Sequence, residues 1–196
     1  MKFLEKKKLK KINKKAEALY QKRERGQSDD TDAQKEIAVH NDLAKFYKKH
    51  LFDKHYPHAE EYMLESYRVA ASLHYAEAQY RLSAHLLERA RFWQKIAKSM
   101  YASSIHQKYI DDTYKEAFAY LKQAEDQGHP LAIRMHGMAY IHGWGVEKDR
   151  DRGFQFIVDS IDEENAWDRA TAIFDELDLN TPEFFSAIMS LRKDKK

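Results

Sequence analysis

The chain has no cysteine, only three prolines and six glycines in 196 residues, and no long apolar run. The absence of cysteine excludes disulfides and thiolate metal sites. Few helix breakers combined with abundant Ala, Leu, Lys and Glu favour an all-helical chain. No stretch approaches the ~18 apolar residues of a membrane span. The lysine-rich start lacks the apolar core of a secretory signal, which predicts a cytoplasmic protein and leaves open export by a signal-peptide-independent secretion system.

Charge is unevenly distributed. The formal net charge is +2, yet residues 1–25 contain eleven Lys or Arg and three Glu, a net of +8 that leaves −6 for the rest. We interpret residues 1–30 as a basic arm and linker that ends in the polar break at 26–30. The arm lysines that we select as candidate contacts are Lys6, Lys7, Lys8, Lys10, Lys11, Lys14 and Lys15.

A thin apolar stripe accompanies these lysines and leaves several interpretations open. Leu9, Ile12, Ala16 and Leu19 recur at helical spacing. The arm is either a solvated helix that packs its stripe on the first helices of the body, or a binding element for an acidic protein groove, an anionic lipid surface or nucleic acid. It lacks the interleaved arginine and aromatic residues that stack on bases, which disfavours nucleic acid.

The region 113–151 contains four of the six glycines and predicts two antiparallel helices. Thr113 and Glu116 have the spacing of a capping box, which predicts a helix start at Thr113. Gly128 and Pro130 predict a left-handed helix end followed by a new helix. Gly137 would allow a neighbouring helix to approach closely, and the run 143–146 would end the second helix.

Helix pairs of this kind cannot bury their apolar stripes alone, which favours a chain built from internally similar pairs. Shifts of 36 residues forward and 54 residues backward superimpose apolar and small positions. The pairs include Phe118 with Phe154, Leu121 with Ile157, Ala132 with Ala78, and Gly137 with Ser83. The difference of 18 residues is about five helical turns, so we predict an elongated helix pair over about 76–128 with a turn near 102–104. Its aromatic positions are either ordinary core or the tip of a helical finger that grips a partner.

These residues resemble the Sel-like repeat, a relative of the tetratricopeptide repeat. The positions that carry the resemblance are 114–129, Ala132, Gly137, Tyr140, Gly143, Gly145, Val146 and Asp149. The match is strongest over 113–151, weaker over 60–87 and 150–178, and absent before about residue 55; Ser83 stands where the family has glycine. The resemblance implies an α-solenoid used for protein–protein contacts, frequent in bacterial secretion and host-interaction systems, and no catalytic residues.

We therefore expect an all-α superhelix of about seven or eight helices, with a single domain over 31–196. It begins with a capping box at 31–34, followed by a turn at 53–58 around Pro57 and a helix from Ala59 to about Leu73. It ends with a helix over 165–177 and a final capping helix that starts at Thr181 and Pro182.

The repeat alignment places one face of the helices in a concave groove, which changes from charged to apolar and Met-rich along the chain. Such a surface suits an adaptable protein or peptide site. The predicted groove residues are Arg81, His85, Leu131, Arg134, Met135, Met138, Tyr140, His142, Trp167 and Phe174. The alternative is that the C-terminal helix, through Phe184, Phe185, Ile188 and Leu191, folds back and covers them.

No pattern of an enzyme emerges. His55 and His58 are the one compact histidine cluster, but Pro57 lies between them and no helical zinc frame exists. The Gly143–Gly145 turn lacks the Lys-Ser/Thr of a nucleotide loop. We expect a non-catalytic interaction scaffold, adaptor or chaperone-like binder, without cofactor, metal or small-molecule substrate. The alternative is a membrane-surface or nucleic-acid accessory protein that acts through the basic arm.

Overall fold

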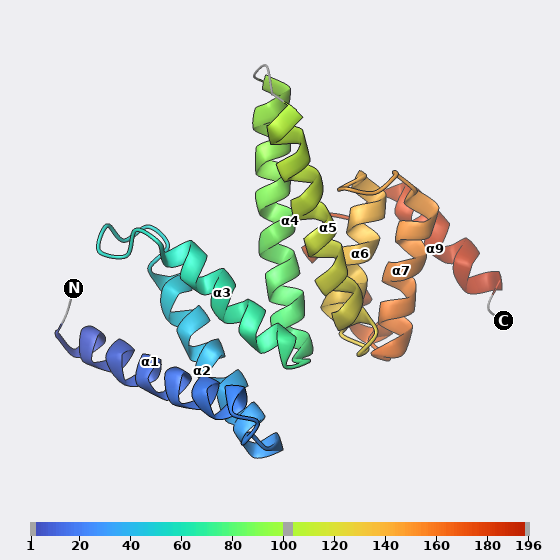
Figure 1. The fold of residues 1–196 in the computed structure, drawn as a ribbon. Coiled ribbons are helices and arrows are strands. Elements are labelled where there is room, and N and C mark those ends of the chain that lie inside the picture. The colour runs from blue at the N-terminus through green and yellow to red at the C-terminus, as the bar shows by residue number, and fades with distance from the viewer. Residues whose placement is uncertain (1–2, 100–103, 195–196) are drawn as a thin grey trace. The chain divides into compact units, whose positions relative to one another are not determined.

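The computed structural model describes residues 3–99 and 104–194, and within these ranges it contains α-helices, one 3-10 helix and no strand (Figure 1). The predicted all-α fold is confirmed, while the superhelical stacking of the helix pairs stays a prediction. No helix in the described ranges is long and apolar enough to cross a bilayer. The chain divides into two compact units, Met1–Leu82 and Ser83–Lys196, with the boundary inside a continuous helix. The division therefore does not follow the polar break at 26–30, where we placed the predicted domain boundary.

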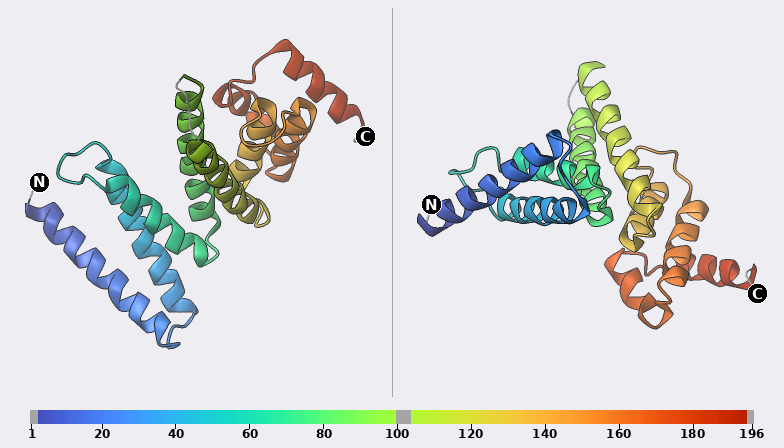
Figure 2. Two further views of the ribbon diagram at one scale, coloured as in Figure 1. Left: turned by 45° about the horizontal axis from the view of Figure 1, so that its top comes forward. Right: turned by 60° about the horizontal axis from the view of Figure 1, so that its bottom comes forward.

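Unit 1 (Met1–Leu82) is built around its second helix, which packs against the first and the third (Figure 2). Its helices are α1 (Phe3–Glu24), α2 (Asp30–Lys49), α3 (Ala59–Ser72) and the start of α4 (Ala76–Ser99). The helix predicted from Ala59 and the turn at 53–58 are confirmed.

The start of α2 corrects one prediction. Asp29, with extended backbone, accepts a hydrogen bond from the Asp32 amide at 2.8 Å, and the Asp32 carboxylate accepts one from the Asp29 amide at 3.4 Å. This reciprocal pair is the capping box, so the helix begins two residues before the Thr31 box that we predicted. The Asp29 carboxylate reaches the free amides first, and Thr31 falls inside the first turn.

The basic arm is a regular helix of unit 1. The stripe formed by Leu9, Ile12, Ala16 and Leu19 is half-buried, and α1 packs along α2 (Figure 2). Three ion pairs join the two helices: Glu5 with Lys49 at 3.8 Å, Arg23 with Glu36 at 3.5 Å, and Lys22 with Asp32. Of the interpretations left open for the stripe, the structure shows the one in which it packs on the body.

Unit 2 (Ser83–Lys196) contains the rest of α4 and five further α-helices among the described residues. These elements are α5 (Ser104–Glu125), α6 (Pro130–His142), α7 (Arg150–Glu163), η1 (Trp167–Arg169), α8 (Ala170–Glu176) and α9 (Pro182–Asp194). The turn predicted near 102–104 lies outside the described residues except for Ser104, the first residue of α5. The predicted helix start at Thr113 is wrong. Thr113 lies inside α5 and donates its hydroxyl to the Tyr109 carbonyl at 2.7 Å, the mid-helix alternative to capping.

The α5–α6 connection and the α6–α7 crossing confirm the glycine predictions. Gly128 has φ +71°, and Pro130 is the first residue of α6. A Cβ atom on Gly137 would lie 2.7 Å from the Gly153 carbonyl oxygen, and one on Gly153 would lie 2.6 Å from that of Gly137. The two glycines therefore allow the α6 and α7 backbones to touch.

The C-terminal elements complete the core of unit 2. The helix predicted over 165–177 is divided, since Asn165 takes a positive φ of 50° and only η1 precedes α8. The predicted start of α9 is confirmed: the Phe184 amide donates to the Thr181 hydroxyl at 3.3 Å. The buried residues of this core are Met138, Ile141, Phe154, Ile157, Val158, Ile161, Ala166, Ala170, Ile173, Phe174, Leu179, Phe184 and Ile188.

Candidate interaction site

Three of the predicted groove residues are buried within unit 2. Arg134 donates from Nε to the Ser160 hydroxyl at 3.1 Å and forms an ion pair with Glu164. Met138 and Phe174 belong to the core, where the Phe184 ring of α9 lies 4.7 Å from the Phe174 ring. The alternative interpretation, in which the C-terminal helix covers this part of the groove, is what the structure shows for Phe174.

The other predicted groove residues do not form one site. Leu131 is 42 % exposed, and Met135 and Tyr140 are half-buried. The Tyr140 ring stacks on Phe156 at 5.7 Å between centroids. The Trp167 indole donates to Asp162 at 2.6 Å. Arg81, which pairs with Glu77, belongs to unit 1, whereas His85 belongs to the part of α4 in unit 2.

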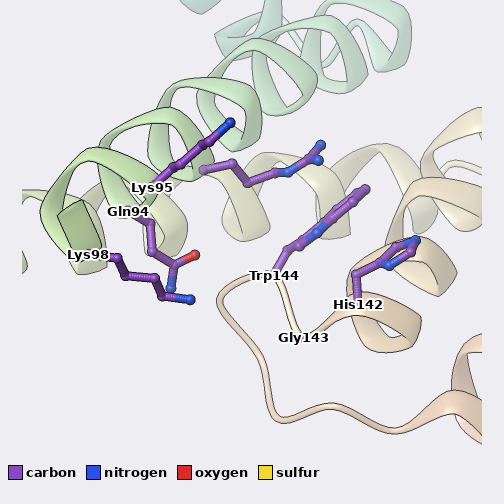
Figure 3. A pocket seen from close by; sticks show the side chains of 7 residues that line it. Gln94, Lys95, Lys98, His142, Gly143 and Trp144 are labelled. Carbon is purple, nitrogen blue, oxygen red and sulfur yellow. The ribbon is translucent and has the colours of Figure 1, made fainter.

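Two of these residues line pockets: Arg81 lines one of about 460 Å³ in unit 1 together with Glu77, and His142 lines one of about 310 Å³ in unit 2. Figure 3 shows Gln94 and Lys98 reaching from α4 toward the loop that carries Gly143 and Trp144. We call this site the cationic pocket, and its lining residues are Arg91, Gln94, Lys95, Lys98, His142, Gly143 and Trp144.

A stack of three side chains forms one wall of the cationic pocket. The Arg91 guanidinium lies 3.8 Å from the Trp144 ring centroid, and the His142 ring stacks on Trp144 at 4.9 Å with an interplanar angle of 14°. Gly143 makes this possible, since its left-handed φ of +72° ends α6 and turns the next residue toward α4. A guanidinium over an indole keeps its planar N–H donors free at the edge.

The Tyr114 side chain of α5 holds this loop in place. Gly145 takes φ +66°, and a Cβ atom there would lie 2.5 Å from the Tyr114 ring, so the backbone rests directly on that ring. The Tyr114 hydroxyl donates to Gln94 Oε1 at 3.0 Å. Gln94 Oε1 accepts this bond, and the amide NH₂ group of Gln94 carries two N–H donors on a side chain that lines the pocket.

The electrostatics of the pocket favour an anion. No lining residue is acidic, and within the described part of the chain Lys95 and Lys98 form no ion pair. Burial lowers the pKa of His142, and the nearby Arg91, Lys148 and Arg150 lower it further. His142 is therefore neutral at pH 7 and can still donate one N–H hydrogen bond.

His142 is among the residues predicted from the sequence, whereas the three cations are not. Arg91, Lys95 and Lys98 follow one another at steps of four and three residues, which places them on one helix face. That spacing was a usable signal. What no local pattern indicated is that this face meets a loop about fifty residues later in the chain.

The two other sites weighed from the sequence have clear positions. All seven arm lysines, Lys6 to Lys15, are exposed on α1. The His58 ring lies 3.0 Å from Glu61, and in the ranges that the structure describes no three metal-ligating side chains gather.

Comparison with known proteins adds no assignment: no family model matches the chain, and no curated protein matches it.

Proposed function

We propose that the protein is a non-catalytic interaction scaffold of the Sel-like repeat type, whose unit 2 binds an acidic segment of a partner protein in the cationic pocket. The observation that carries this proposal is the set of three cations, Arg91, Lys95 and Lys98, on a pocket without a carboxylate. Uncompensated cations in a preformed cleft attract carboxylates, and each charge-assisted hydrogen bond adds to the affinity.

The charge of the surrounding unit favours a short acidic segment over a long polyanion. Residues 83–196 contain sixteen Lys or Arg and nineteen Asp or Glu, a net of −3. A nucleic acid or a membrane would face this negative body beyond the pocket, whereas a peptide touches only the pocket itself.

The spacing of the cations also suits a peptide. Arg91 and Lys98 are seven residues apart on α4, about 10 Å along the helix axis. An extended chain with acidic residues at alternate positions presents a carboxylate about every 7 Å. Two or three such side chains would reach the cations together.

Two structural features support the repeat-type scaffold. The Gly128–Pro130 turn and the close approach of a neighbouring helix at Gly137, both predicted from residues that carry the resemblance to Sel-like repeats, are present. The helix α9 closes the apolar core at the end of the chain, as a capping helix does. A helical frame that presents a cleft lined by cations suits an adaptor role.

The test is binding of an acetylated hexaglutamate peptide, followed by the fluorescence of Trp144. Replacing Trp93 and Trp167 by Phe leaves Trp144 as the one emitting indole, so that peptide bound elsewhere is not detected. We expect saturable binding that weakens about tenfold in Lys95→Gln/Lys98→Gln, since each exposed charge contributes up to ~1 kcal/mol.

The matched control is Lys108→Gln/Lys115→Gln, which removes two exposed cations from α5 and lowers the net charge equally. It is expected to bind within twofold of the parent. An absent Trp144 response, or an equal loss in the control, would refute the pocket as the binding site.

A further inference from the structure

The seven arm lysines are exposed along α1, and two of them, Lys8 and Lys15, border pockets that α2 residues also line. On a helix of 3.6 residues per turn they span an arc of about 200°, opposite the packed stripe of Leu9, Ile12, Ala16 and Leu19. Lys6 and Lys15 are nine residues apart, about 14 Å along the axis. Seven positive charges therefore occupy less than three turns of one exposed surface.

None of these charges is neutralised by the described residues. The ion pairs of α1 use Glu5, Lys22 and Arg23 and leave all seven lysines without a carboxylate partner. Like charges at this density repel one another, and an external anionic surface would relieve that repulsion.

Two exposed apolar side chains flank the same end of unit 1. Leu4, on α1, is 75 % exposed, and Phe52, in the turn after α2, is exposed to 101 % of its reference area. The ion pair between Glu5 and Lys49 joins the start of α1 to the end of α2, so the chain segments that carry Leu4 and Phe52 are neighbours. Transfer of the exposed Phe52 side chain from water to an apolar phase is favourable in free energy.

We propose that α1, with Leu4 and Phe52, docks unit 1 on an anionic lipid surface. Lysines provide attraction to the acidic headgroups, and the two apolar side chains enter the interface. The stripe of α1 stays packed on α2, so docking requires no unfolding of the arm.

Lipid is favoured over nucleic acid by the chemistry of this face. Base stacking needs aromatic or arginine planes, and the seven cations here are all lysine. Exposed Leu4 and Phe52 would meet only solvent or phosphates on a duplex, whereas a bilayer offers them hydrocarbon. This docking does not depend on the cationic pocket of unit 2.

The test is co-sedimentation of the full chain with phosphatidylcholine vesicles, with or without about one third phosphatidylglycerol. Binding is expected only to the anionic vesicles, and it should fall steeply with added salt. Each lysine near such a surface contributes about fivefold in affinity, so Lys7→Gln/Lys11→Gln/Lys14→Gln should bind about 100-fold more weakly. These three lysines are exposed on the outward face, and circular dichroism would verify that the helices are retained.

The control Lys108→Gln/Lys115→Gln/Lys122→Gln changes the net charge equally on α5 and should bind within about twofold of the parent. Phe52→Ser should weaken binding about fivefold without changing its salt dependence. Equal binding to neutral vesicles, an equal loss in the α5 control, or tighter binding to an RNA or DNA duplex at matched phosphate concentration would overturn the proposal.

Discussion

Both units bury a charged side chain, Glu36 in unit 1 and Arg134 in unit 2, but they differ in what else they enclose. Unit 1 encloses ionisable groups: Glu36 is 1 % exposed with Arg23 as its ion-pair partner, and His40 Nδ1 is buried without a hydrogen-bond partner among the described residues. Unit 2 is held by a backbone contact between Gly137 and Gly153 and by a core in which Phe184 is fully buried.

This contrast predicts different weaknesses. A core of close-packed rings and touching backbones is sensitive to the volume of a side chain. A core that encloses a charge and a neutral histidine is sensitive to protonation. Unit 2 should therefore respond most to changes in size, and unit 1 to changes in pH.

The largest effect is expected for Phe184→Ala. The Phe184 ring contacts Phe154 at 4.8 Å and Phe174 at 4.7 Å between centroids, so its removal leaves a cavity at the centre of unit 2. The free energy of unfolding should fall by about 4 kcal/mol, measured by urea denaturation. The neighbouring Phe185 is 43 % exposed, and Phe185→Ala should cost less than about 1 kcal/mol.

The same variant tests whether α9 covers the apolar face of unit 2. If it does, a hydrophobic dye should bind Phe184→Ala and a 1–180 truncation, but not the parent or Phe185→Ala. Dye binding by the parent at the same level would show that the face is open.

Gly137→Val is expected to lower the free energy of unfolding by about 3 kcal/mol, the next largest effect. Its Cβ would meet the Gly153 carbonyl oxygen at 2.7 Å, and because that atom is backbone, the α6–α7 pair must separate. Gly128→Ala is the comparison, since space around Gly128 is free and only its left-handed φ opposes a side chain. That variant should cost about 1 kcal/mol. Equal losses in the two variants would contradict the close crossing.

The structural features that can be predicted from the sequence are those determined by residues close together in the chain. Gly128, Pro130 and Thr181 determine the backbone of their own turns, and the predictions made from them are confirmed. Thr113 also carried a capping pattern, yet it lies inside α5, because nothing in residues 104–112 interrupts the helix.

The candidate site was less accessible to sequence reasoning. Phe174 and Met138 have the periodicity of a groove, and only the position of α9 shows that they are core. The cationic pocket joins Lys95 and Lys98 to Trp144, and no local pattern states which loop faces a helix surface. The spacing of residues identifies which of them share a helix face, whereas the segment that lies against that face is determined by the tertiary structure.

The smallest of these effects tests unit 1 through pH. Burial, with a contribution from Arg23, lowers the pKa of His40 from 6.5 to about 4. Between these pH values His40 is protonated in the unfolded chain and neutral in the folded unit. The free energy of unfolding therefore decreases as the pH falls from 6.5 to 4, and this contribution does not change further below 4. Since His40 is only partly buried, the loss should be about 2 kcal/mol. His40→Gln should lack this part of the acid sensitivity in urea denaturation at stepped pH, whereas His58→Gln, at an exposed site, should follow the parent. Parallel curves for the parent and His40→Gln would mean that unit 1 accommodates a charged His40, and the predicted difference in acid sensitivity between the two units would be lost.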